Sequence, residues 1–121
     1  MTFGQYLNGL NESAEYSDLE KNLAHFTRAI GHPARVAVLL EIARRGYRIH
    51  GEIIDVPQLS KATVLQHLRE LKRAGFIQGR IFGAKSEYYI DTDLIMEFKK
   101  TFDQFMNDFE KGKTEFKVNI S

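Results

Sequence analysis

The residues with the clearest chemical potential lie between positions 60 and 73, on one predicted helix. Its expected outward face combines small, hydrogen-bonding and charged side chains: Lys61, Ala62, Thr63, Gln66, Arg69, Glu70 and Arg73. A glutamine amide can pair with adenine, an arginine or lysine can bind guanine or phosphate, and small residues allow close approach to base edges. This chemistry suits recognition of double-stranded DNA, although an ordinary amphipathic surface helix has the same pattern.

A second cationic pair follows in a predicted β-hairpin. Arg80 and Lys85 stand on either side of Gly83, where two β-rich runs, 76–82 and 86–90, meet in a turn. A basic two-stranded wing can lie along the phosphate backbone or enter the minor groove. A solvent-exposed turn carrying ordinary surface charges is the alternative.

The charge of the chain is concentrated in the same region. Residues 44–85 contain nine Lys or Arg and three acidic residues, a net charge of +6, whereas the whole chain carries only +1. Residues 1–43 carry −2 and residues 86–121 carry −3. A neutral chain with a basic middle is expected from a local phosphate footprint, and an unevenly charged solvated surface remains the alternative.

Other kinds of chemistry find little support. The sequence has no Ser/His/Asp or Cys/His arrangement, phosphate-cradling glycine loop or metal cluster, so we do not expect an enzyme or a cofactor. It has no cysteine, which excludes disulfides and thiolate metal sites and fits a reducing cytoplasm. Neither a signal peptide nor an apolar run long enough to cross a membrane is present, so we expect a cytoplasmic protein.

Helix signals place the first elements. Phe3, Tyr6, Leu7 and Leu10 have the spacing of a short amphipathic helix. Ser17 and Glu20 form a capping-box pattern before a helix over about 18–30, and Pro33 begins a helix that Gly46 ends.

The central segment predicts a helix-turn-helix. Residues 51–56 are expected to form a short helix that Pro57 ends, and Ser60 caps the next helix, which runs to about Ala74. Two short helices joined by a tight turn are the outline of this motif.

The last predicted helix is capped by Asp91 or Asp93 and runs to about 111. It carries a narrow apolar seam at 3-4-3-4 spacing: Ile95, Phe98, Phe102, Phe105 and Phe109. This seam either packs on the core of its own domain or pairs with the same helix of a second subunit, and a pocket for an apolar effector is a third reading. The length of the helix favours pairing, to which Phe3 and Leu7 of the first helix are expected to contribute.

Three stretches resemble the ArsR-type winged-helix repressors. RAIGHPARVAVLLEI (28–42) resembles the segment that precedes their helix-turn-helix, EIIDVPQLSKATVLQHLRELKRAGFI (52–77) the motif itself, and SEYYI (86–90) their second wing strand. The resemblance implies a symmetric dimer, formed by the last helix and often the first, that binds a pseudo-palindromic operator and represses until an inducer binds. It implies DNA contacts from the recognition helix and the wing: Ser60, Lys61, Ala62, Thr63, Gln66, His67, Arg80 and Lys85.

The sequence also departs from that family. Ile49 and Gly51 stand where many metal-sensing members have a Cys-x-Cys pair, and the last helix has acidic residues but no histidine, so no metal site is expected. Leu65 replaces a residue that is often small and polar, which leaves the base preference open. Gln58 stands where the turn often has glycine, and a positive φ there would cost about 1 kcal/mol.

We therefore expect one mainly α domain over 1–121, a winged helix-turn-helix with a small β-hairpin wing that dimerises through its terminal helices. N-terminal dimer-associated helices (1–31) precede a DNA-binding core with its wing (32–91), a dimerisation helix (92–112) and a C-terminal tail (113–121). The expected function is sequence-specific regulation of transcription by a homodimeric repressor, with a small-molecule effector left open. A winged-helix module that binds protein and not DNA is the alternative.

Overall fold

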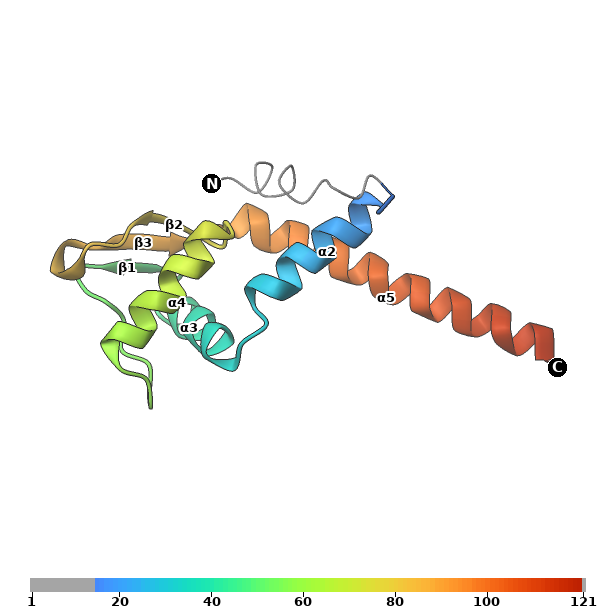
Figure 1. Ribbon diagram of the computed structural model, residues 1–121, viewed down its shortest axis with the longest axis horizontal. Coiled ribbons are helices and arrows are strands. Elements are labelled where there is room, and N and C mark those ends of the chain that lie inside the picture. Colours follow the sequence, from blue (N-terminus) through green and yellow to red (C-terminus); the bar gives the residue numbers. More distant parts are fainter. Residues whose placement is uncertain (1–14, 121) are drawn as a thin grey trace.

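Figure 1 shows a computed structural model of the chain, which describes residues 15–120 and the side chains of residues 15–113. The elements in order are α2 (Asp18–Ala29), α3 (Pro33–Arg44), β1 (Arg48–His50), α4 (Lys61–Arg73), β2 (Ile77–Arg80), the 3-10 turn η1 (Gly83–Lys85), β3 (Glu87–Ile90) and α5 (Thr92–Ile120). The predicted mainly helical fold with a small β wing is confirmed. The segment predicted as a helix at 3–10, including Phe3 and Leu7, lies outside the described residues.

The predicted helix starts are confirmed by their caps. The Ser17 hydroxyl accepts a hydrogen bond from the Glu20 N–H at 3.1 Å, and the Glu20 carboxylate accepts one from the Ser17 N–H at 2.8 Å. At the start of α3, His32 Nδ1 accepts from the Ala34 N–H at 3.0 Å and Pro33 occupies the first helical turn. These bonds satisfy N–H groups that the first turn of a helix leaves without partners.

The predicted helix at 51–56 is wrong, because residues 53–56 are extended and irregular. The Ile54 N–H donates to the Tyr88 hydroxyl at 3.0 Å and not to a helical carbonyl. Ile54 and Val56 are buried while Asp55 between them is exposed, which is the alternation of an extended chain. The helix α4 therefore packs mainly against α3 and the sheet, without a short helix before the turn.

The wing is a three-stranded antiparallel sheet in the order β1-β3-β2, one strand more than the predicted hairpin. β2 pairs with β3 from Ile77↔Ile90 to Arg80↔Glu87, and β1 joins the other side of β3 through Ile49↔Tyr88. The three residues of β1 are too few to show the period-two pattern by which a strand is predicted.

The core forms where α2, α3, α4, the sheet and the start of α5 meet. Phe26 of α2 stacks on Phe98 of α5 with ring centroids 5.2 Å apart, and Phe76 meets both rings edge-on at 6.1 Å. Further fully buried apolar side chains come from α3, α4, β2, β3 and the segment before α4: Val38, Ile42, Ile54, Val64, Leu68, Leu71, Ile77 and Tyr88. One continuous core thus fixes α4 and the wing relative to each other.

The helix α5 begins at the cap predicted for it and continues further than predicted. The Asp91 carboxylate accepts a hydrogen bond from the Leu94 N–H at 3.1 Å. The helix extends to Ile120, so the segment expected as a tail from 113 is helical through that residue. Its first turns pack on α2, and its later turns run away from the rest of the molecule (Figure 1).

We predict that Gly79→Ala strongly destabilises the fold. Gly79 has φ +101°, and a Cβ there would lie 2.3 Å from the Glu87 carbonyl oxygen across the ladder. Gly46 is the matched control, because its φ of +86° is similar but a Cβ would meet nothing within 4 Å. Both alanines carry the left-handed backbone cost of about 1–2 kcal/mol, and only Gly79→Ala adds the clash. Urea unfolding should show a clearly larger loss for Gly79→Ala, and equal losses would contradict the strand geometry.

Candidate nucleic-acid interface

The exposed face of α4 lies opposite its buried stripe. Val64, Leu68 and Leu71 are at most 1% exposed and point into the core. Ala62, Gln66, Arg69 and Arg73 lie on the side of the helix opposite this buried stripe, and all four are exposed. Because successive residues of an α-helix are rotated by about 100°, these four side chains point in directions within about 60° of one another. One stripe of α4 thus carries four of the residues that the sequence places on the outward face.

The start of α4 combines a filled cap with exposed polar groups. The Ser60 hydroxyl accepts from the Thr63 N–H at 3.2 Å and donates to the Thr63 hydroxyl at 2.9 Å. Lys61 beside it is exposed and Thr63 is half-buried. Ser60 therefore holds the end of the helix in place, while Lys61 and Ala62 are the open positions of the first turn.

Two charged groups on α4 partly neutralise each other. Arg73 Nη1 donates to both carboxylate oxygens of Glu70, at 3.1 and 3.3 Å. The predicted outward set includes Glu70, which is half-buried beside the stripe. Arg69 has no such partner on the helix among the described contacts, so the free positive charge of the stripe is centred on Arg69.

His67, which the sequence places near the boundary of the outward face and among the predicted DNA contacts, is buried beside the core in the single chain. Only 8% of it is exposed, and its Nδ1 accepts a hydrogen bond from Arg35 Nε at 3.4 Å. Its ring lies 4.9 Å from that of His32, the cap of α3. His67 therefore joins α4 to the start of α3, because its position in the helix falls next to the buried stripe.

The structure shows the conformation and burial of the two residues, Gln58 and Leu65, that depart from the family pattern in the turn and in α4. Gln58 adopts φ +69°, the left-handed conformation considered for this turn position. A non-glycine residue in that conformation costs about 1 kcal/mol. Leu65 is half-buried at the edge of the exposed stripe. A methyl group in that position can both cover the core and touch an apolar base edge.

The wing presents the two predicted cations. Arg80 closes β2 and Lys85 lies in η1, and both are exposed. An Arg80 guanidinium N–H donates to the Lys85 carbonyl at 3.4 Å, so the two residues lie on either side of the tip. At the base of the wing the Lys72 ammonium donates to the Gly79 carbonyl, which ties the end of α4 to β2.

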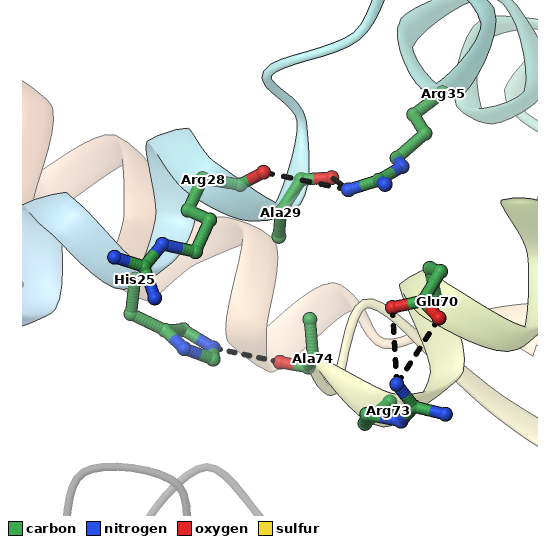
Figure 2. Close-up of a pocket in the computed structure, with 7 residues that line it drawn as sticks. All are labelled: His25, Arg28, Ala29, Arg35, Glu70, Arg73 and Ala74. Atoms are coloured by element: carbon green, nitrogen blue, oxygen red, sulfur yellow. Dashed lines mark hydrogen bonds and ion pairs between the residues drawn. The ribbon is translucent and has the colours of Figure 1, made fainter. Parts of the chain in front are cut away.

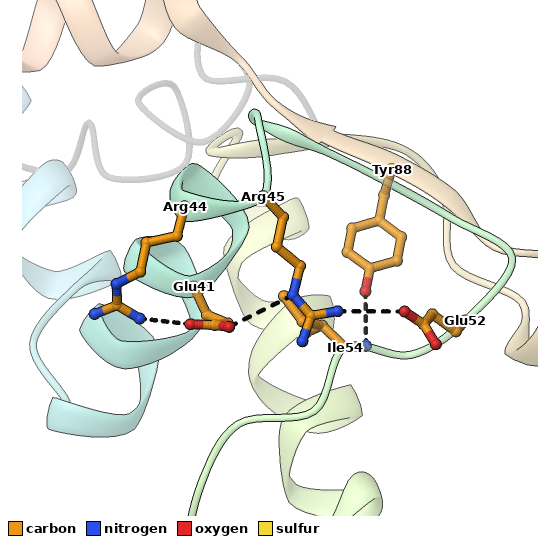
Figure 3. Close-up of polar contacts among 6 residues, drawn as sticks. All are labelled: Glu41, Arg44, Arg45, Glu52, Ile54 and Tyr88. Carbon is orange, nitrogen blue, oxygen red and sulfur yellow. Dashed lines mark hydrogen bonds and ion pairs between the residues drawn. The ribbon is translucent and has the colours of Figure 1, made fainter.

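A polar network missed by the sequence reasoning holds the segment before α4 (Figure 3). Glu41 of α3 pairs with both Arg44 and Arg45, and Arg45 also reaches Glu52 at 3.3 Å. Beside it the Tyr88 hydroxyl receives the Ile54 N–H, and burial raises the pKa of Tyr88. The Glu41 pairs are local contacts at the end of α3, whereas the Ile54–Tyr88 bond joins residues 34 positions apart, so no local pattern predicts that bond.

A small cleft of about 70 Å³ lies where α2, α3 and α4 meet (Figure 2). His25 Nε2 donates to the Ala74 carbonyl at 2.8 Å, across the cleft from α2 to the end of α4. Arg35 donates to the Ala29 carbonyl at 3.2 Å as well as to His67. The arginine side chains seen in Figure 2 are directed to different partners and do not converge on one point. The hydrogen bonds around the cleft therefore serve mainly to join the three helices.

The phenylalanine seam of α5 divides into two parts. Ile95 and Phe98 are half-buried and pack against the core of their own chain. Phe102 and Phe109 are 42% and 58% exposed, and Phe105 lies between them with ring centroids 6.3 and 4.8 Å away. Own-core packing therefore accounts for the first half of the seam and leaves the second half uncovered in the single chain.

Two other features bear on the kind of protein. Within the part of the chain that the structure describes, no three His, Cys, Asp or Glu side chains gather where they would bind a metal ion. No helix in that part has the length and apolar character to span a bilayer.

A three-stranded wing following a helix with an outward polar face defines a winged helix-turn-helix protein, and comparison with known proteins gives the family. Residues 32–78 match the family described as "Bacterial regulatory protein, arsR family". The chain is 33% identical over 81 residues to an uncharacterized HTH-type transcriptional regulator of Methanocaldococcus jannaschii, a match covering 67% of this chain and 91% of that protein. The chain belongs to the ArsR family of transcriptional regulators, which are DNA-binding proteins and not enzymes.

A solved structure shares the fold. An ArsR-like transcriptional regulator from Rhodococcus sp. RHA1 superimposes with a TM-score of 0.65 at 16% identity, over 84% of this chain and 95% of that one. At this identity the likeness concerns the fold alone. It supports the arrangement of the helices and the wing described above.

We predict that the fold loses stability as the pH falls below about 6.5. Burial, with the nearby His32 and Arg35, lowers the pKa of His67, and Glu70 only partly opposes this. Burial and Arg28 likewise lower the pKa of His25, against the hydrogen bond to Ala74. The unfolded chain then binds more protons than the folded chain, so the stability these histidines contribute is present above the unfolded pKa and is lost below it.

Urea unfolding between about pH 7.5 and pH 5 isolates this effect, because the window lies above the ordinary range of carboxyl groups. We expect the free energy of unfolding to fall toward pH 5, and His67→Gln to flatten the slope. An unchanged slope in His67→Gln would show that His67 is not responsible.

Proposed function

We propose that this regulator binds double-stranded DNA sequence-specifically as a homodimer and represses transcription from a pseudo-palindromic operator. In this proposal each α4 enters the major groove of one half-site and each wing contacts the flanking backbone. The single observation that carries it is the exposed stripe Ala62, Gln66, Arg69 and Arg73, directly opposite the buried side of α4. Repression follows if the bound dimer covers the promoter.

The chemistry of the stripe favours base reading over general charge attraction. Gln66 has the amide geometry that pairs with adenine, and Arg69 the fork that pairs with guanine. Ala62 has no side chain beyond Cβ, which allows the start of the helix to lie deep in the groove. Ser60, Lys61 and Thr63 at this end, and Arg73 at the other, are then placed for contacts to the phosphates that fix the register.

The wing supplies the second part of the footprint. Arg80 and Lys85 are exposed at its tip, and the segment 44–85 that contains both α4 and the wing has a net charge of +6. A module that binds only protein has no need of this local charge. We therefore favour DNA as the partner of this face.

The homodimer is supported by the uncovered half of the α5 seam. Phe102, Phe105 and Phe109 form a continuous row of rings, and Met106 beside them is also exposed. Such a row on a helix that extends beyond its own domain is suited to pairing with the same helix of a second chain. Two α4 helices about 34 Å apart would then face successive major grooves on one side of the duplex.

We predict that Gln66→Glu and Arg69→Glu each weaken DNA binding about 10- to 100-fold, the range for loss of one good base contact. The change removes a donor and adds a negative charge at the groove. Fluorescence anisotropy with a duplex covering the region upstream of the regulator's own gene measures it, with random DNA as competitor at physiological salt. Equal affinity for the two DNAs would refute sequence specificity.

Lys100→Glu is the matched control. It makes the same charge change as Arg69→Glu, but on an exposed position of α5 that faces away from the phenylalanine row. We expect it to bind the specific duplex nearly as tightly as the unmodified chain. If Gln66→Glu and Arg69→Glu also retain affinity while circular dichroism shows them folded, α4 is not the reading helix and a protein partner becomes the better hypothesis.

We predict that Phe102→Glu with Phe109→Glu converts the dimer to a monomer. Both side chains are exposed in the single chain, so the change leaves the core intact but places charges in the proposed interface. Sedimentation velocity at micromolar concentration should show half the mass, with Gln104→Glu on the opposite face as control. A double variant that still sediments as a dimer would refute pairing through this row.

A further inference from the structure

The tip of the wing carries a large aromatic side chain that the proposed contacts do not use. Phe82 is 69% exposed, more than any other large apolar side chain in the described residues. Its neighbour Ile81 is half-buried and packs on the core. A single exposed apolar residue needs no special explanation, so the inference rests on how Phe82 is held and on what surrounds it.

The backbone at Phe82 is fixed on both sides. Its N–H donates to the Ser86 hydroxyl at 2.8 Å, and its carbonyl accepts from the Lys85 N–H at 3.0 Å. The same Ser86 hydroxyl donates to the Gly83 carbonyl at 2.7 Å. Both main-chain groups of Phe82 are thus satisfied inside the tip, while its ring remains outside.

The tip is also braced against the rest of the sheet. Ser86 is 2% exposed although it lies in a turn, and its carbonyl accepts from the Gly51 N–H at 2.7 Å. That bond ties the end of the wing to the segment after β1. The backbone that carries the ring is thus held before any partner binds, so little main-chain freedom is lost on insertion.

Positive charge flanks the ring. Arg80 precedes it and Lys85 follows it, and both are exposed. Glu87 also lies near the tip, opposite Arg80 in the ladder, but its carboxylate is engaged by Arg48 at 3.5 Å. Figure 1 places this tip and the start of α4 at the same end of the long axis, opposite the end of α5. An apolar ring between two cations does not resemble a protein-docking groove, but it suits a groove with phosphates on both rims and stacked bases between them.

We propose that Phe82 is an apolar wedge that enters the minor groove beside each half-site, partly unstacks one base step and bends the duplex. The proposal rests on the DNA binding proposed above. Inserted phenylalanine, leucine and methionine side chains kink DNA in this way in minor-groove binding proteins. Arg80 and Lys85 hold the two phosphate rims while the ring replaces base–base stacking with base–phenyl stacking.

The wedge makes part of the sequence preference indirect. Pyrimidine–purine steps unstack most easily, so we expect such a step where the wing meets the flank of each half-site. No hydrogen bond to that step is needed. Its replacement by a stiff A-tract should weaken binding although α4 contacts none of the changed bases.

The test uses the whole chain described by the sequence. A duplex that the chain binds specifically is first selected from a random library. That duplex is then prepared with a dye pair at its ends and with 2-aminopurine in place of one flanking adenine at a time. For the unmodified chain we expect a rise in 2-aminopurine emission at one step on each flank, and closer dye ends on binding. Phe82→Ala should abolish both signals and weaken binding roughly 5- to 100-fold, as for loss of one ring stacked on bases. Phe82→Leu should retain a partial signal, because leucine also wedges.

Two controls separate the wedge from other effects. Tyr47→Ala removes an exposed aromatic side chain at the opposite end of the same sheet, and it should leave both signals and the affinity unchanged. Arg80→Ala should lower the salt dependence by about one phosphate contact, whereas Phe82→Ala should leave the salt slope intact. A melting curve for each variant shows that the wing is folded.

The outcomes distinguish this inference from the function on which it rests. If Phe82→Ala binds and bends the duplex like the unmodified chain, or if bound DNA shows no unstacking, the wedge is refuted while DNA binding stands. If no specific duplex emerges from selection with the unmodified chain, the proposed function itself fails.

Discussion

The burial of one stripe of α4 is the constraint on which the rest of the site depends. Val64, Leu68 and Leu71 are removed almost completely from water, and each such side chain contributes about 1.5–3 kcal/mol. Rotation of the helix about its axis would expose all three, at a cost far above any local helix preference. Gln66 and Arg69 therefore face outward because the core holds the other side of the helix. No interaction among the outward polar side chains is needed to fix the orientation of α4.

The position of the wing depends on the same core, but through polar contacts that reach across the sequence. Tyr88 is fully buried in β3 while its hydroxyl accepts the Ile54 N–H of the segment before α4. A buried N–H without a partner costs about 1–3 kcal/mol, so this bond favours an extended segment over the helix predicted there. The path of residues 51–56, and with it the angle between α4 and the sheet, is set by a tyrosine more than thirty positions later.

Short sequence patterns were enough to predict features that depend only on neighbouring residues, namely the helix caps and the turn before α4. Ser17, Ser60 and Asp91 satisfy the N–H groups of the helices they begin, and the positive φ at Gln58 follows from the turn that precedes α4. The sequence reasoning failed where the partner is remote. β1 exists because β3 lies beside it, and His67 is buried because Arg35 and His32 of another helix cover it. The phenylalanine spacing on α5 is the same in both halves, so only the tertiary structure separates core from free surface.

The helix α5 has a first part that packs on the core and a later part whose phenylalanines are exposed, and the later part runs away from the rest of the molecule. The stack of Phe98 on Phe26 and its edge-on contact with Phe76 fix the first turns of the helix to the domain that carries α4 and the wing. Phe102 and Phe109 lie on the later turns of α5, beyond that anchor. Figure 1 shows the end of α5 at the opposite end of the long axis from the wing and the start of α4. In the proposed dimer, the separation of the two α4 helices would therefore depend on the direction in which α5 leaves the domain at the Phe26–Phe98 stack.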